Sequence, residues 1–513
     1  MEELCMEIKN PILPGFYPDP SACAVGEKFY LVNSSFCYFP GVPIFESTDL
    51  KHWHQIGNVL DRSTQLPLHE DGMSRGIFAP TIRYNNGTFY MITTNCSHGG
   101  NFVVTATDPA GPWSEPHYLA GADGIDPSLF FDEDGKCYYI GTRPNPEGVG
   151  HNGDWYIYIQ ELDLENWCLI GDYKLVWNGA MRKAEWPEGP HLYKKDGWYY
   201  IMHAEGGTGP AHAVCVARSR DIFGPYENNL MNPVFTHRHL GKAYPIRYVG
   251  HADLIQAKDG EWYAVMLASR PCEQHSNLGR ETFLAKVTWE DEWPVFNEGV
   301  GILEEVVTVP FEDQGGETVT YGKNAKGIPF NMVALRNPVE GMVTAENDGY
   351  RMKVLPYTLF EPKPTAYLGI RQTSYHFTAS TGVQFSPSEN EEAGLALLQS
   401  EESSLVAVYG KHDGATKVRV LVKKFGKPVQ EIASEKVSAD RVFLTISQNG
   451  QTATVSYNAG TGEQVLVTGL STKFLSTEAA GGFVGCTIGM YASANGKESS
   501  NTAFFDGIAY RAE

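Results

Sequence analysis

Short apolar runs alternate with polar turns through residues 1–305, and one pattern of them occurs five times. Each copy holds an apolar run, a tight turn and a second run rich in aromatic residues, as in DPSLFFDEDGKCYYIGT. The turns contain pairs such as Asn86-Gly87, which are typical of β-hairpins. The copies lie roughly 50 to 60 residues apart, enough for about four strands each, and begin at Asp19, Ala79, Asp126, Glu188 and His251. The pattern predicts a five-bladed β-propeller.

The opening positions of the copies are chemically unusual. If the copies are blades, these positions lie on one ring around the propeller axis, so that Asp19, Asp126, Glu188 and His251 converge on one cavity. Asp-Pro and Gly-Pro pairs also favour turns for local reasons, which is the alternative interpretation. Turn chemistry does not explain why the position is acidic in three copies, His in one and Ala in another.

The pattern changes after residue 305. Residues 306–323 are rich in acidic residues and Gly, and we interpret them as a linker. Residues 324–513 contain alternating strands separated by turn signals such as Asp413-Gly414 and Asn449-Gly450, without helical periodicity. The chain is therefore predicted to be all-β, with a C-terminal β-sandwich of the jelly-roll, concanavalin-like kind after the propeller. The sandwich either binds carbohydrate or packs on the propeller and closes its pocket, and the lack of an obvious exposed Trp platform favours packing.

Composition and charge exclude several classes of function. The formal net charge of −21 argues against nucleic-acid and anionic-membrane partners, and is compatible with a neutral ligand such as a sugar. The sequence contains no P-loop, GxGxxG or HExxH motif and no apolar run of about 20 residues. The nine Cys form no CxxC pair, and the acidic N-terminus lacks an apolar signal core. We therefore expect a cytoplasmic protein.

Three carboxylates on one ring fit glycoside hydrolysis. That reaction needs one carboxylic acid to protonate the leaving oxygen and one carboxylate to activate water or to attack carbon. A third negative charge raises the pKa of the acid and keeps it protonated near neutral pH. Phe36 and Phe78 are expected beside the ring of carboxylates and would stack on a sugar ring, with packing inside a blade as the alternative for each.

Six ordered segments resemble the signatures of glycoside hydrolase family 43, which contains β-xylosidases and α-L-arabinofuranosidases. They are FYPDPSACAVGEKFYLVNSSF, GIFAPTIRYNNGTFYMITT, GIDPSLFF, EGPHLY, VGHADL and LGRET. The end of the chain, FFDGIAY, resembles the sandwich of the xylosidase branch. The resemblance implies that Asp19 is the general base, Glu188 the general acid and Asp126 the carboxylate that tunes the acid.

The resemblance also assigns supporting residues. Arg280 would bind the terminal sugar, and His251 would support the site through water or a bound metal, often calcium. Phe36 would contact the sugar, while Phe78 stands where many relatives have Trp. Phe504 would wall the pocket from the sandwich. Glu312, Asp313 and Asp506 have the oxygen ligands for a calcium site in the sandwich, but we favour their interpretation as solvated surface carboxylates.

The predicted function is an inverting, exo-acting hydrolase. It would release xylose from the non-reducing ends of xylo-oligosaccharides, with α-L-arabinofuranosidase side activity and no cofactor in the chemistry, although a structural Ca²⁺ near His251 is one interpretation. The alternatives are a primary α-L-arabinofuranosidase, and a non-catalytic carbohydrate-binding propeller. A fructosidase is disfavoured because its Asn-Asp-Pro-Asn and Arg-Asp-Pro motifs are missing. The partners expected are oligosaccharides such as arabinoxylan fragments, and a homo-oligomer is left open.

Overall fold

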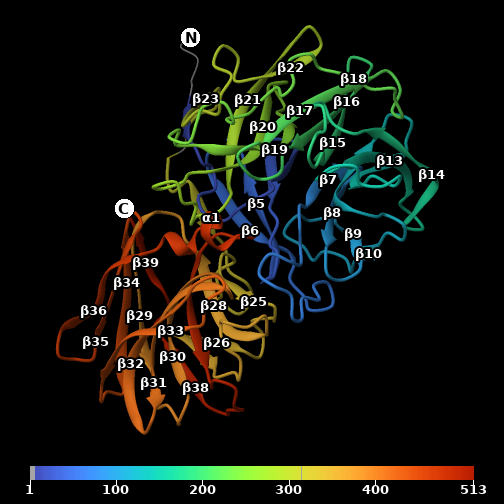
Figure 1. The fold of residues 1–513 in the computed structure, drawn as a ribbon. Helices are drawn as coiled ribbons and strands as arrows, with labels where there is room; N and C mark the ends of the chain where they lie inside the picture. Colours follow the sequence, from blue (N-terminus) through green and yellow to red (C-terminus); the bar gives the residue numbers. More distant parts are fainter. Residues whose placement is uncertain (1–5, 314) are drawn as a thin grey trace.

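The protein consists of two β-domains that lie against each other (Figure 1). The structure, a computed structural model, describes residues 6–313 and 315–513. The upper domain in Figure 1 is the propeller, and the lower one is the sandwich. No helix among the described residues is long and apolar enough to cross a membrane.

Five sheets form the propeller, and the four main strands of each follow one another along the chain. The first blade contains β2 (Ser21–Val25), β3 (Lys28–Val32), β5 (Gly41–Ser47) and β6 (Trp53–Leu60). The second contains β7 (Thr81–Asn85), β8 (Thr88–Asn95), β9 (Gly100–Ala106) and β10 (His117–Tyr118). The third contains β11 (Ile125–Phe131), β12 (Cys137–Pro144), β13 (Trp155–Asp163) and β14 (Cys168–Trp177). The fourth contains β15 (Glu188–Lys195), β16 (Trp198–Glu205), β17 (Ala213–Ser219) and β18 (Glu227–Asn228). The fifth contains β19 (Arg247–Gln256), β20 (Trp262–Ser269), β21 (Glu281–Glu290) and β22 (Trp293–Phe296).

The predicted repeat corresponds to the two inner strands of each blade. In the second blade, for example, Asn86 and Gly87 connect β7 to β8 with φ values of 47° and 85°. Both values lie in the left-handed region, as a two-residue hairpin turn requires. The sequence pattern therefore located the blades because tight turns of this kind are restricted to few residue types.

The ring closes without a strand shared between the first and fifth blades among the described residues. An isolated backbone bridge between Leu13 and Thr282 and several side chains make the closure instead. Asn10 exchanges two hydrogen bonds of 2.9 Å with the backbone of Leu284, and Asn33 donates one of 2.9 Å to the hydroxyl of Thr282. These bonds join the start of the chain to β21 and so hold the two ends of the propeller together.

A buried network on the axis joins all five blades. Arg83 of β7 donates bonds of 2.8 and 3.0 Å to Asp253 of β19, and one of 3.0 Å to Nδ1 of His191 on β15. Ser21 of β2 donates to Asp253 at 2.6 Å, and the hydroxyl of Ser128 on β11 lies 3.0 Å from His191 Nδ1. Burial opposes ionisation of Asp253, but the Arg83 guanidinium outweighs it and holds the pKa of that carboxyl well below its usual range.

The second domain is a sandwich of two large sheets over one apolar core. One sheet contains β25 (Val333–Leu335), β28 (Thr365–Arg371), β30 (Glu392–Ser400), β31 (Ser403–His412), β32 (Ala415–Lys423), β33 (Gln430–Lys436) and β37 (Thr487–Ser493). The other contains β26 (Val343–Glu346), β27 (Gly349–Lys353), β29 (His376–Gln384), β34 (Arg441–Asn449), β35 (Thr452–Asn458), β36 (Glu463–Ser471), β38 (Thr502–Phe505) and β39 (Ala509–Ala512). A short helix, α1 (Thr477–Ala480), follows the 3₁₀ turn Lys473–Leu475. The sandwich lies against the propeller, which agrees with the packing role expected for it (Figure 1).

One sheet crosses the domain boundary. Strand β4 (Tyr38–Phe39) of the propeller pairs with β25 of the sandwich through Tyr38 with Leu335 and Phe39 with Ala334. The guanidinium of Arg371 in the sandwich also donates a 2.7 Å bond to the carbonyl oxygen of Phe16. The two domains are thus joined by backbone pairing as well as by side chains.

The segment 306–323, expected to be a linker, contains two strands. Strand β23 (Val306–Val309) pairs with β1 (Met6–Lys9), and β24 (Val319–Tyr321) extends the first blade by pairing with β6. Strands of four and three residues are too short to show alternation in a polar segment. Their pairing buries Val307 and Val309 against the propeller, which fixes the path of the chain into the sandwich.

Two of the three carboxylates named for a sandwich calcium site are each paired with a cation. Asp313 forms an ion pair of 2.5 Å with Lys51, and Asp506 forms one of 2.5 Å with Arg441. Their cationic partners replace the oxygen set that calcium needs. The interpretation as surface carboxylates is the one that the contacts favour.

Candidate active site

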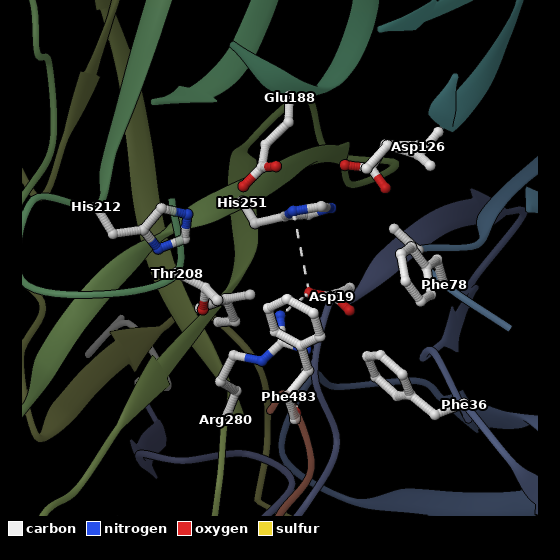
Figure 2. Close-up of a pocket in the computed structure, with 13 residues that line it drawn as sticks. Asp19, Phe36, Phe78, Asp126, Glu188, Thr208, His212, His251, Arg280 and Phe483 are labelled. Carbon is white, nitrogen blue, oxygen red and sulfur yellow. Dashed lines mark hydrogen bonds and ion pairs between the residues drawn. The ribbon is translucent and has the colours of Figure 1, made fainter. Parts of the chain in front are cut away.

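A pocket lies at one end of the propeller axis, and the sandwich contributes one of its walls (Figure 2). The residues that line it come from all five blades and from the loop before β37. They are Asp19, Phe36, Phe78, Ala79, Ile125, Asp126, Glu188, Thr208, His212, His251, Leu267, Arg280 and Phe483. Seven of the eight residues singled out from the sequence are among them.

Three of the predicted ring residues adopt the same unusual backbone conformation. Asp19, Asp126 and His251 have φ values of 49°, 54° and 51°. This left-handed conformation is uncommon for residues other than glycine, and it occurs here where each inner strand meets the axis. The repeated local bend places the three side chains on one cavity, as the sequence repeat predicted.

The fourth ring residue is displaced by one position, which corrects the predicted alignment. Glu188 pairs with Ala204, as Ile125 of the neighbouring blade pairs with Thr142. The counterpart of Asp126 is therefore Gly189, with φ 57°. A Cβ atom at Gly189 would lie 2.8 Å from the imidazole of His251, so a larger residue has no room there. The carboxyl group of this blade is therefore carried by Glu188, the residue before the glycine.

Asp19 is held by two donors. The hydroxyl of Ser34 donates to Oδ2 at 2.6 Å, and Nη1 of Arg280 donates to Oδ1 at 2.6 Å. The carboxylate is buried, with 5 % of the residue exposed. Bonds from both sides orient it, which is what a group that must accept a proton from a positioned water requires.

The electrostatics of the pocket separate Glu188 from its neighbours. Burial, and then the negative charges of Asp126 and Asp19, raise the pKa of Glu188 well above its usual range. Burial also raises the pKa of Asp126 to about 6, although the charge of His251 and a 3.2 Å bond from the Gly189 amide oppose this. Glu188 is thus the carboxyl group that keeps its proton at neutral pH.

An aromatic wall faces the carboxylates. The ring centroid of Phe36 lies 5.5 Å from that of Phe78 and 6.2 Å from that of Phe483. The guanidinium of Arg280 lies 5.7 Å from the Phe36 centroid and 5.8 Å from that of Phe483. An apolar surface beside charged groups suits the two faces of a sugar ring.

Phe504 does not belong to this wall, and this prediction was wrong. It lies on β38 in the sandwich sheet that does not carry β25, and its ring packs under the guanidinium of Arg351 at 5.4 Å. Phe483 takes the predicted role from the loop before β37, and its backbone amide donates a 2.9 Å bond to the hydroxyl of Ser74 in the propeller. The only sequence signal for this loop is the run Gly481-Gly482-Phe483-Val484-Gly485.

Two polar residues of the pocket were missed from the sequence. His212 donates from Nδ1 to the carbonyl of Tyr248 at 2.8 Å, and burial lowers the pKa of its imidazole to about 4. Its Nε2 and the hydroxyl of Thr208 are buried without a partner among the described residues. Both lie in the GGTGPAH segment after β16, a Gly-rich loop outside the repeated pattern, and both suit a sugar hydroxyl.

The surroundings of His251 fit a calcium ion poorly. Its Nδ1 lies 4.0 Å from Oδ1 of Asp19, an oxygen that already accepts the bond from Arg280. Arg83 pairs at 2.8 Å with Asp253, which lies two residues after His251 on β19, so a cation already occupies this part of the axis. Calcium requires about six to eight oxygen ligands, and a second cation would be repelled here. No step of the chemistry is assigned to a metal.

Carboxyl groups of unequal pKa around a sugar-sized pocket with an aromatic wall define the class of the protein, which is a glycoside hydrolase. Residues 8–294 match the model of glycosyl hydrolases family 43, and residues 324–511 match the β-xylosidase C-terminal concanavalin A-like domain. The chain belongs to glycosyl hydrolase family 43. The fold class and the enzyme class predicted from the sequence are confirmed.

Curated relatives align over nearly the whole chain. A xylosidase/arabinosidase of Butyrivibrio fibrisolvens is 51 % identical, with 96 % of this chain and 97 % of the relative covered. A non-reducing end α-L-arabinofuranosidase of Bacteroides ovatus is 37 % identical, with 98 % and 94 % covered. Among solved structures, a xylan β-1,4-xylosidase of Bacillus halodurans superposes with a TM-score of 0.90 at 30 % identity, covering 98 % of this chain and all of that one.

Proposed function

We propose that the protein is an inverting exo-glycosidase that releases xylose from the non-reducing ends of xylo-oligosaccharides. The observation that carries this proposal is the contrast between two carboxyl groups in one pocket. Glu188 has a strongly raised pKa, whereas Asp19 is oriented by Ser34 and Arg280. One group therefore supplies a proton and the other accepts one.

The reaction is a single displacement. Asp19 accepts a proton from a water molecule while the water oxygen forms a bond to the anomeric carbon. The bond from that carbon to the glycosidic oxygen breaks, and the oxygen takes the bonding electrons and the proton of Glu188. The configuration at the anomeric carbon is inverted because no bond to the enzyme forms. Asp126 keeps Glu188 protonated through its charge, and Arg280 positions both Asp19 and the sugar.

The closed end of the pocket supports exo attack. The loop that carries Phe483 covers the pocket from the sandwich side, and Arg280 donates to the Phe483 carbonyl at 3.3 Å. A single terminal sugar fits beneath this wall, whereas a long chain would have to pass through it. The relatives named as β-xylosidases and as xylosidase/arabinosidases support xylose as the sugar released.

A second substrate, α-L-arabinofuranose, is supported by the Bacteroides ovatus relative that is named as an arabinofuranosidase and by the dual name of the Butyrivibrio protein. We propose it as a side activity of the same pocket. The acceptors of Thr208 and His212, which have no partner within residues 6–313 and 315–513, suit hydroxyl groups of either pentose.

Proton NMR of the protein acting on xylobiose tests the proposal. We expect α-xylose to appear first, before mutarotation mixes the anomers. Early β-xylose would mean retention of configuration and would make Asp19 a nucleophile. If xylobiose remains intact while an arabinose-substituted xylo-oligosaccharide is cleaved, arabinose release is the primary activity. If neither is cleaved, the proposed function is wrong.

A further inference from the structure

Three metal-binding side chains gather in the fourth blade, apart from the residues that line the catalytic pocket. His203 of β16 pairs directly with Cys215 of β17, so their side chains project from the same face of the sheet. Side chains alternate along a strand, and Glu205, two residues after His203, therefore projects from that face as well. One ligand atom from each of the three residues lies within 4.8 Å of the other two. Strand pairing thus brings an imidazole, a carboxylate and a thiol to one point.

This cluster is closed to solvent. The exposed fraction of the side chain is 0 % for His203 and 4 % for Glu205, and Cys215 is fully buried. The ring of Trp177 on β14 has its centroid 6.4 Å from that of His203, so the cluster lies between the third and fourth blades. Polar groups in such a place need partners inside the protein, because burial removes them from water.

Hydrogen bonds satisfy the cluster only in part. Nε2 of His203 lies 2.8 Å from Oε1 of Glu205, and the same oxygen accepts a 2.5 Å bond from the Ala180 amide. Nδ1 of His203 and Oε2 of Glu205 are buried and have no partner in the described part of the chain. A buried carboxylate oxygen without a donor, beside an imidazole and a thiol, is a set of ligands for a metal ion.

The chemistry of the three side chains selects zinc. Calcium and magnesium prefer oxygen ligands, whereas thiolate and imidazole suit zinc. Tetrahedral zinc with bonds of about 2.0 to 2.3 Å places its ligand atoms about 3.3 to 3.8 Å apart, which is within the span of the cluster. When Cys215 releases its thiol proton to water, its thiolate and the Glu205 carboxylate together balance the two charges of the ion. The second oxygen of Glu205 or a water molecule supplies the fourth ligand.

The cluster also holds the loop 178–187, which connects β14 to β15. The Ala180 amide of this loop donates to Glu205, and a Cβ atom at Gly179 would lie 3.2 Å from the same carboxylate oxygen. The backbone of the loop therefore packs directly on Glu205. The loop ends where β15 begins, at Glu188. An ion that fixes Glu205 consequently fixes the segment before Glu188.

We propose that His203, Glu205 and Cys215 form a structural zinc site that holds the loop before Glu188. The site goes beyond the hydrolase function, because it lies outside the pocket and its ion takes no part in the reaction. Its effect is on the stability of the fourth blade, and the loss of zinc should lower the temperature at which the protein unfolds.

Metal binding by the full chain tests the site. The protein is freed of metal with a chelator and then given Zn²⁺ or Co²⁺. We expect one equivalent of zinc to remain after dialysis, measured by elemental analysis, and the thermal midpoint to rise by about 5 °C. Cobalt reports the ligands, because a thiolate bound to Co²⁺ gives an intense charge-transfer band in the near ultraviolet. This band should appear at one equivalent of Co²⁺.

Variants locate the ion. Cys215→Ser and His203→Gln should each lose the cobalt band and the retained zinc. Cys137→Ser is the matched control: it changes another buried thiol of the propeller, on β12 of the third blade, and it should keep both.

Each other outcome overturns the zinc site. A wild-type protein that retains no zinc, or that binds Co²⁺ without the thiolate band, has no such site. A band that persists in Cys215→Ser or in His203→Gln places the ion elsewhere. If one of these variants does not fold, the other variant and the wild-type measurements decide. None of the readouts involves sugar cleavage, so failure of the zinc site leaves the proposed function to its own test.

Discussion

At the scale of single residues, the site depends on unequal environments for similar side chains. Glu188 and Asp126 are both buried, and the pKa of Glu188 is raised further by the charges of Asp126 and Asp19, that of Asp126 by the charge of Asp19. Asp126 is partly compensated by His251 and by the Gly189 amide. Burial and like charge therefore raise the pKa of both groups, but at Asp126 the charge of His251 and the Gly189 amide oppose the rise.

Asp126→Asn tests this arrangement through the pH dependence of kcat. Removing the charge of Asp126 lowers the pKa of Glu188, so the acid loses its proton at a lower pH. The alkaline limb of the pH–rate profile should move down by about one unit, while the maximum rate falls. Rates on xylobiose between pH 5 and 9 measure this. Asp132→Asn is the control: it changes a carboxylate of the third blade that is bound to Lys194 and Tyr199 of the fourth, and it should leave the limb in place. An unshifted limb in Asp126→Asn would remove Asp126 from the tuning role.

Much of the site could be predicted because symmetry relates its residues. Asp19, Asp126 and His251 begin copies of one pattern, and a repeat brings equivalent positions together whatever their distance in the sequence. Phe504 and Phe483 do not belong to the repeat, so symmetry does not place either of them. Which loop of the sandwich reaches the propeller depends on how two domains pack, and periodicity along one chain carries no information on that. Glu188 was identified from the repeat, but one position away from the true equivalent of Asp126. The residue pattern does not show that Gly189 occupies that position.

At the scale of elements, the inner strands do more than form hydrogen-bond ladders. Strands β2, β7, β11, β15 and β19 each contribute a polar residue to the network around Arg83 and Asp253. The repeat predicted the blades but gave no indication of this network, because its members differ in type from blade to blade. Only the superposition of the five strands on one axis reveals that they complement one another.

Arg83→Met tests the contribution of this network to stability. The change leaves the buried carboxylate of Asp253 without its counter-ion, and breaking a buried pair in this way costs about 3 to 5 kcal/mol. The free energy of unfolding in urea should fall by that amount. Replacing both partners, as in Arg83→Met with Asp253→Leu, should recover part of the loss because no charge remains buried. Arg351→Met, which removes an ion pair with Glu346 on the surface, should have little effect. An equally small effect of Arg83→Met would argue against a role of the axis in holding the blades.

At the scale of the whole molecule, the active site is completed by both domains. Phe483 comes from the sandwich but lies on the aromatic wall with Phe36, while its backbone bonds to Ser74 and Arg280 of the propeller. The backbone bonds do not depend on the ring. The position of the loop and the chemistry of its side chain can therefore be separated by mutation.

Phe483→Ala should raise KM for xylobiose and lower kcat/KM about 10-fold, because one face of the sugar loses its apolar contact. The fold should be retained, since 43 % of this residue is exposed. Phe504→Ala is the matched control, because it removes the other candidate phenylalanine of the sandwich, outside the pocket, and its kinetics should equal those of the wild type. Steady-state rates and thermal midpoints of both variants measure this. A kinetic loss in Phe504→Ala without one in Phe483→Ala would reverse the assignment.

The pairing of β4 with β25 restricts how the two domains can evolve. A sandwich that supplies both a pocket wall and the partner of a propeller strand cannot be exchanged as an independent module, as binding domains on flexible tethers can. Recombination at the boundary would leave an open sheet edge on each side and an incomplete site. The two halves of this gene are therefore expected to be inherited together, and changes in one half should be matched by changes in the other.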